Sequence, residues 1–354
     1  MSNPVFVLIL AGVLLPAIVW LSRVLPGERW QFLASIPVGK GEEEARPGNW
    51  RGINLTWYGL LLAFGNLVGV AAFFLLLSAV GLEVRLSLAL IAVIMAAAVA
   101  AAKTIARLVE GKANTFTVAG GAAAGLYLMP LVVWSMSGLL PQGVAPATWI
   151  MVAMAALAIS YLLGEGIGRL ACVSFGCCYG KPLTELGATA SWFFSRFATT
   201  YRGDTKKIAY ASGLTGVPVA SIQALTAFLS VSVGLAAMYL FLEGWFSLAF
   251  LLSSLFAMGW RLLSERFRAD YRGEGRLTAY QKMGICNLIF SLALFWLLPA
   301  DHGPATRLAD GLAALWDPGV LLFLQALWMG LFVYFGASRV TGASMRFHVR
   351  QGQV

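Results

Sequence analysis

Long apolar segments recur along the whole chain and constrain its fold more than any other feature. A helix needs about 20 consecutive apolar residues to cross the hydrocarbon core of a membrane. Such segments lie at 4–25, 54–80, 86–106, 117–140, 146–167, 217–242, 245–263, 283–299 and 319–338. The sequence therefore predicts an all-α polytopic membrane protein with about nine transmembrane helices and a small polar insertion near residues 168–216.

The composition excludes a soluble globular protein. Only 12% of the residues are charged and 59% are hydrophobic, whereas soluble domains carry about a quarter charged residues. The first apolar segment has no Lys or Arg before it, unlike a secretory signal peptide. We therefore expect this segment to be a retained span.

We expect three regions along the chain. Residues 1–53 hold an extra N-terminal span and a polar loop, and residues 54–299 form the membrane core. Residues 300–354 hold an extra C-terminal span and a basic tail. Within the last region, residues 300–318 are short and include two prolines, so they are interpreted as an interfacial loop.

The basic residues are distributed very unequally between the two faces of this topology. With nine alternating spans, 23 of the 25 Lys and Arg residues fall on one face, and only Arg85 and Arg307 fall on the other. Basic loops usually stay in the cytoplasm, which predicts an outside N-terminus and an inside C-terminus. A site for an anionic phospholipid would also gather basic residues on its own face, but it would not explain the nearly bare opposite loops.

An ionisable pair and several glycines form the first candidate site. Glu165 and Arg169 are four residues apart at the end of an apolar segment, so they can meet on one helical face. Ionisable residues in such segments are rare and usually paired or functional. A plain helix-end ion pair is the alternative. The accompanying glycines permit close helix contacts, and they are Gly164, Gly168, Gly176 and Gly180.

A basic cluster at the end of another apolar segment is the second candidate site. Residues 261–282 contain six basic side chains, enough to hold a phosphate group through charge-assisted hydrogen bonds. A solvated helix end is the alternative interpretation. The ionisable residues at its start are Arg261, Glu265, Arg266, Arg268, Asp270 and Arg272. A third feature, Trp57-Tyr58-Gly59, also fits an aromatic belt at the membrane interface.

Four cysteines do not suggest a disulfide framework. Cys172, Cys177 and Cys178 lie within seven residues, and Cys286 lies in an apolar segment. Zinc ligation by the first three is conceivable, but no nearby histidine completes a tetrahedral set. We expect Cys177 and Cys178 to be small, buried structural residues without a bound metal, and we expect no cofactor.

Taken together, these motifs resemble the prolipoprotein diacylglyceryl transferase family over about residues 54–299. The Gly168-Arg169-Leu170 motif and the Glu265–Asp270 segment are the most specific. The matching positions, in order, are Leu55 to Leu60, Gly120, Gly121, Gly125, Gly168 to Leu170, Gly176, Gly180, Pro218, Gln223, Arg261 to Asp270, Met283 and Gly284.

The resemblance implies an activity and roles for individual residues. Family members move a diacylglyceryl group from phosphatidylglycerol to a cysteine thiol and release glycerol 1-phosphate. By this resemblance Arg169 and Arg268 hold the phosphate, and Tyr58 is functional, with Glu165 near the reacting centre. The implied substrate-binding residues are Gly120, Gly121, Gly168, Gly176, Gly180, Arg261 and Glu265. Phosphatidylglycerol is the expected partner, nucleic acid is not, and the bacterial cytoplasmic membrane is the expected location.

The chain departs from the family pattern at three positions. Ala119 stands where the family often has His, Cys172 where it has Asn, and Gln223 where it has Glu. The usual general base is therefore missing, and Glu165 and Tyr58 are the nearest titratable candidates. Family members also carry the motifs on the face away from the cytoplasm, opposite to the charge-based prediction here.

Two alternatives to the transferase function remain open. The first is a divergent paralogue that transfers a glycerolipid group to a non-lipoprotein acceptor at the cytoplasmic face. The second is a lipid-binding or scaffolding membrane protein without catalysis, which the missing histidine favours. The sequence does not identify the acceptor.

Overall fold

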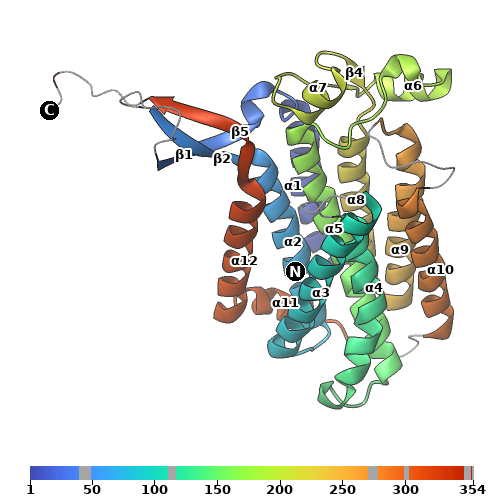
Figure 1. The fold of residues 1–354 in the computed structure, drawn as a ribbon. Coiled ribbons are helices and arrows are strands. Elements are labelled where there is room, and N and C mark those ends of the chain that lie inside the picture. Colours follow the sequence, from blue (N-terminus) through green and yellow to red (C-terminus); the bar gives the residue numbers. More distant parts are fainter. Residues whose placement is uncertain (40–48, 111–116, 270–277, 299–302, 347–351, 353–354) are drawn as a thin grey trace.

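The computed structural model describes residues 1–39, 49–110, 117–269, 278–298, 303–346 and 352. Within these residues, nine helices are long and apolar enough to cross a membrane, and they pack side by side as a bundle (Figure 1). They are α1 (Asn3–Val24), α2 (Trp57–Ala79), α3 (Val84–Glu110), α4 (Val118–Ser135), α5 (Pro146–Phe175), α8 (Ile222–Leu242), α9 (Phe246–Ser264), α10 (Ala279–Leu297) and α12 (Pro318–Gly336). The predicted all-α polytopic membrane fold is confirmed.

Helix α5 is the central element of the bundle and packs against α2, α8, α9 and α4. Its contact with α2 is very close because glycines line both helices. A Cβ atom on Gly65 of α2 would lie 2.7 Å from the Gly164 carbonyl oxygen and 2.8 Å from the Gly168 nitrogen. Small residues of this kind let membrane helices pack backbone to backbone. The packing fixes the part of α5 that carries Glu165 and Arg169.

Helix α5 extends further than the sequence predicts. The span was expected to end at residue 167, but the helix continues to Phe175 and ends at Gly176, which has a left-handed backbone (φ 71°). Leu170, Ala171 and Val173 are buried and continue the helical core. Glu165 and Arg169 therefore lie within the helix, and the polar insertion begins at Gly176 instead of residue 168.

The insertion covers one end of the bundle (Figure 1). It contains η3 (Leu183–Glu185), α6 (Ala188–Ser195), β3 (Thr199–Thr200), α7 (Lys207–Ser212) and β4 (Pro218–Val219). Lys206, between β3 and α7 of the insertion, is fully buried. Its Nζ donates to the carbonyl oxygens of Leu25 (3.2 Å) and Ser174 (2.6 Å). Burial lowers the pKa of Lys206 to about 8, so at neutral pH this side chain remains a cation. It ties the ends of α1 and α5 together.

A small sheet joins the polar regions near the two ends of the chain. It consists of β1 (Phe32–Gly39), β2 (Asn49–Thr56) and β5 (Ala337–Arg346), in the order β1-β2-β5 with antiparallel pairing. A short 3-10 turn, η1 (Glu28–Trp30), precedes it. The sequence predicted a polar loop and a basic tail here. Their pairing was missed because it depends on contacts between segments about 300 residues apart.

The other end of the bundle differs from the prediction in one segment. Residues 300–318 were interpreted as a loop, but Leu308–Leu315 form helix α11, which packs on α2. A Cβ on Gly311 would lie 2.3 Å from the Leu75 carbonyl oxygen, so this glycine permits the close contact. The same end carries the 3-10 turn η2 (Ser137–Leu139).

The alternation of the helices separates the two faces as the charge distribution predicted. The insertion, the sheet and the segment after α9 share one end of the bundle (Figure 1). Arg85 lies at the start of α3 and Arg307 immediately before α11, both at the other end. The extra N-terminal span, α1, packs against α8, and the extra C-terminal span, α12, packs against α2. Which end faces the cytoplasm stays a prediction.

We predict that Gly65→Ala destabilises the bundle because the added methyl group meets backbone atoms of α5 that cannot move independently. The cost should be about 1–3 kcal/mol, as for other overpacked contacts. Thermal unfolding of the detergent-purified protein measures it. The matched control is Gly12→Ala on α1, where a Cβ meets nothing within 4 Å. If both variants unfold with the wild-type midpoint, the close α2–α5 contact does not support the fold.

Candidate functional site

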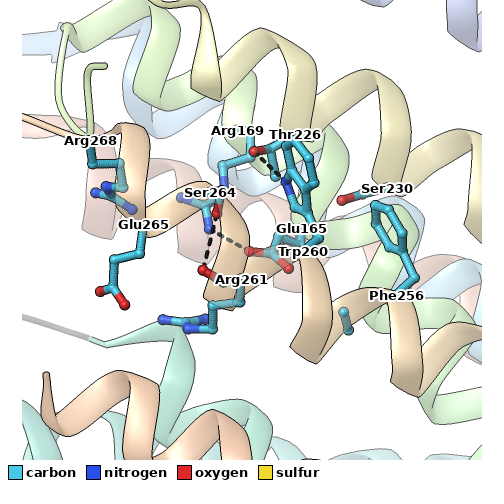
Figure 2. Close-up of a pocket in the computed structure, with 11 residues that line it drawn as sticks. Glu165, Arg169, Thr226, Ser230, Phe256, Trp260, Arg261, Ser264, Glu265 and Arg268 are labelled. Carbon is cyan, nitrogen blue, oxygen red and sulfur yellow. Dashed lines mark hydrogen bonds and ion pairs between the residues drawn. The ribbon is translucent and has the colours of Figure 1, made fainter. Parts of the chain in front are cut away.

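Ionisable side chains from α5 and α9 meet in one pocket near the insertion. Figure 2 shows the residues around this pocket. Its described lining is Glu165, Arg169, Thr226, Ser230, Phe256, Ala257, Trp260, Arg261, Ser264, Glu265 and Arg268. Arg169 and Arg268 line it together although 99 positions separate them. Their predicted convergence is confirmed, and their roles stay a prediction.

Arg169 is held by an ion pair within its own helix. Glu165, one turn earlier on α5, pairs with its guanidinium group, and the two side chains are only 10% and 16% exposed, respectively. The Nε of Arg169 is buried and has no hydrogen-bond partner among the described residues. A buried donor without a partner costs about 1–3 kcal/mol. A ligand oxygen at this position would remove that cost.

Arg268 is positioned by the chain that follows α5. Gly180 and Arg268 form an isolated antiparallel bridge, flanked by two backbone hydrogen bonds. The Lys181 nitrogen donates to the Phe267 carbonyl (2.8 Å), and the Ala269 nitrogen donates to the Tyr179 carbonyl (3.0 Å). The loop after α5 therefore determines where the second arginine stands.

The remaining pocket wall comes from α8, α9 and η4 (Glu265–Phe267). Trp260 Nε1 donates to Thr226 Oγ1 (2.9 Å), and Trp260 stacks on Phe256. Thr278 Oγ1 donates to a Glu265 carboxylate oxygen (3.3 Å). Sequence reasoning missed Thr226, Ser230, Phe256 and Trp260 because they look like ordinary residues of apolar helices.

The pocket has an excess of positive charge. Its described lining contains three arginines and two glutamates, and Glu165 is already paired with Arg169. Arg261 and Glu265 also line it, and their predicted role in substrate binding stays a prediction. A guanidinium group binds phosphate through planar, paired hydrogen bonds. The arrangement suits a ligand with an anionic group such as a phosphate.

Tyr58 lies beside this pocket but is not part of its described lining. It stands at the start of α2, where Thr56 caps the helix, and its ring contacts Phe175 edge to face at 5.7 Å. It is close enough to interact electrostatically with Arg169 and with Cys172, Cys177 and Cys178. Tyr58 therefore borders both the arginine and the cysteines.

The glycines predicted to bind substrate occupy packing and turn positions, and their role in substrate binding stays a prediction. A Cβ on Gly120 would lie 3.0 Å from the Ala101 carbonyl oxygen, and Gly121 faces Ala98, both between α3 and α4. Gly168 lies at the α2–α5 contact, Gly176 ends α5, and Gly180 lies close to Ala220. None of the five belongs to the described pocket lining.

The loop after α5 gathers three cysteines. The sulfur atoms of Cys172, Cys177 and Cys178 all lie within 4.8 Å of one another, and none of the three forms a disulfide within the described part of the chain. They are only partly buried, whereas Cys177 and Cys178 were predicted to be buried. The backbone carries both sulfurs back toward α5 because Gly176 and Cys178 adopt left-handed conformations.

Gln223 holds this loop from the start of α8. Its Nε2 donates to the Cys177 carbonyl (2.9 Å) and to the Tyr201 hydroxyl (2.9 Å). Burial raises the pKa of Tyr201, which therefore stays protonated. Hydrogen bonds with Cys172 and Cys178, together with burial, raise the pKa of the Cys177 thiol. The cysteine loop is thus braced by polar contacts on its inner side.

Some of the sequence positions fall outside the described residues, namely Asp270, Arg272, His302 and His348. Ala119, where the resembled family often has histidine, is buried in α4. No model of a known protein family matches the chain, and no curated protein matches it significantly. The resemblance to diacylglyceryl transferases rests on the motif residues themselves.

Proposed function

We propose that the chain is a membrane-embedded transferase that moves a diacylglyceryl group from phosphatidylglycerol to a thiol acceptor. The observation that carries the proposal is the shared pocket of Arg169 and Arg268, with Arg261 beside them. Two guanidinium groups from distant segments face one cavity, and Arg169 keeps a buried donor without a partner. Guanidinium groups brought together in this way bind phosphate through charge-assisted hydrogen bonds.

The proposed reaction forms one bond and breaks another. The acceptor thiol loses its proton to water, its sulfur attacks the glyceryl carbon that bears the phosphate ester, and a C–S bond forms. The C–O bond breaks, and its electron pair stays on the phosphate oxygen, so glycerol 1-phosphate leaves. Arg169 and Arg268 stabilise the charge that grows on this leaving group. Glu165 acts as a positioning residue, because its carboxylate is paired with Arg169.

The surroundings of the pocket fit a lipid donor. The pocket is lined by residues of α5, α8, α9 and η4, and the headgroups of a bilayer lie beyond the ends of its spanning helices. Phe256 and Trp260 give one wall an apolar surface, which suits the start of an acyl chain. The pocket therefore places charged side chains next to an apolar wall, which supports a lipid donor.

The activity can be tested with purified protein and phosphatidylglycerol labelled in its headgroup, in the presence of a small thiol. We expect release of water-soluble glycerol phosphate. Arg169→Lys and Arg268→Lys should each lower the rate of glycerol phosphate release at least about tenfold. The ammonium group of lysine cannot form the paired, planar hydrogen bonds that a guanidinium group forms with phosphate. Arg196→Lys is the matched control, since Arg196 is exposed on the insertion and stacks on Trp192.

The outcomes distinguish the candidate functions. Phosphatidylglycerol binding without any release would favour the non-catalytic lipid-binding protein, which the buried Ala119 in place of histidine also favours. Neither binding nor release would contradict both functions. Release that survives both arginine substitutions unchanged would remove these residues from the site.

Orientation decides which acceptors the site can reach, and we propose that the pocket end faces the cytoplasm. The unequal distribution of basic residues supports this. In a background without the native cysteines, we compare Thr189→Cys on the insertion with Ser137→Cys at the other end, both exposed positions. A membrane-impermeant maleimide should label Ser137→Cys in intact bacterial cells and Thr189→Cys only after permeabilisation.

The reverse labelling pattern would place the pocket outside. It would then favour a translocated prolipoprotein as the acceptor. The pattern predicted here would require a cytoplasmic acceptor instead.

A further inference from the structure

We infer that Cys172, Cys177 and Cys178 form a zinc site that binds and activates the acceptor thiol. The sequence prediction of no metal relied on the lack of a histidine to complete a tetrahedral set. The structure brings a third thiol, from the last turn of α5, to the adjacent pair. Three protein ligands with one open position are typical of catalytic zinc, whereas structural zinc has four.

The geometry of the three sulfurs suits one metal ion. Sulfur ligands at about 2.3 Å from a tetrahedral zinc lie about 3.8 Å from one another. The three sulfur atoms here lie within 4.8 Å of one another, so movements of about 1 Å or less bring them to that spacing. Cys178 keeps a left-handed backbone (φ 58°), which is rare for a residue other than glycine. This conformation turns the chain so that both loop thiols reach Cys172.

The cluster lies next to the arginine that the proposed reaction needs. Cys172 follows Arg169 by three residues on α5, about one helical turn. Arg169 interacts electrostatically with Cys172 and Cys178, so its positive charge offsets part of the charge of three thiolates. Tyr58 borders the same sulfurs. A ligand in the open zinc position would therefore stand close to the phosphate-binding side of the site.

A bound zinc ion would promote deprotonation of the acceptor thiol, the task of the missing general base. This part of the inference rests on the proposed function. An acceptor thiol that binds the open position gives up its proton to water and becomes a zinc-bound thiolate. Its sulfur then attacks the glyceryl carbon while glycerol 1-phosphate departs. The product is a neutral thioether, a weaker zinc ligand than a thiolate, so it leaves the metal. A histidine in place of Ala119 is not required for this chemistry.

Metal analysis of the purified chain tests the site directly. We expect about one zinc per chain after exposure to ZnCl₂ and removal of excess metal. Cobalt in its place should give sulfur-to-cobalt charge-transfer absorption. Cys172→Ser, Cys177→Ser and Cys178→Ser should each lower zinc binding at least about tenfold. Cys286→Ser is the matched control, because Cys286 is exposed on α10, outside the cluster.

The same variants separate the metal site from the transferase activity. Wild-type protein that binds no zinc and shows no thiolate absorption with cobalt overturns the inference, whether or not phosphatidylglycerol is turned over. This wild-type measurement holds even if a variant fails to fold. Zinc that binds through the three cysteines, with thiol transfer lost on chelation and restored by ZnCl₂, supports both parts. Transfer that continues at the full rate in the chelated protein overturns the activating role.

Discussion

The ion pair between Arg169 and Glu165 is the interaction on which the site depends. Both residues lie within a membrane-spanning helix, where charged side chains are expensive. A partner within the same helix reduces that cost, but removing either member would leave the other buried and unpaired, typically at a cost of about 3–5 kcal/mol. The pair therefore keeps a cation at a defined place in the bundle, with one nitrogen still unpartnered.

The surrounding structure holds this cation in position. Glycine contacts between α2 and α5 fix the helix that bears it, and α8 and α9 supply the wall opposite. The end of α5 then sets the rest of the site, because the loop after Gly176 bridges to Arg268. The last turn of α5 and the loop after it carry the three cysteines. The same loop also positions Arg268. Two of the positions that depart from the resembled family, Cys172 and Gln223, lie at this loop.

Hydropathy and helical spacing were sufficient to predict much of the molecule. The nine spans follow from runs of apolar residues, and the pairing of Glu165 with Arg169 follows from a separation of four residues. The convergence of Arg169 and Arg268 was predicted from the family resemblance, since no local pattern links residues so far apart. The continuation of α5 past Gly168 was missed because a glycine stabilised by tertiary contacts need not end a helix.

Other features depend on the path of the backbone in three dimensions. The pairing of β2 with β5 joins segments from opposite ends of the sequence, so no local sequence pattern indicates it. The cysteine cluster requires the left-handed conformations of Gly176 and Cys178, which sequence spacing does not specify. The glycines assigned to substrate binding also lie at packing and turn positions that only the three-dimensional structure reveals. Their packing contacts explain them without a ligand.

A double-mutant cycle on phosphatidylglycerol affinity is the most direct test of whether Arg169 and Arg268 bind the same phosphate group. The dissociation constant would be measured in lipid nanodiscs for the wild type, Arg169→Lys, Arg268→Lys and the double variant. Residues that share a ligand group are coupled, so the second substitution should weaken binding less than the first, with a coupling energy of about 1 kcal/mol or more. Effects that add to within about 0.5 kcal/mol would show that the two arginines act independently, contrary to a shared phosphate site.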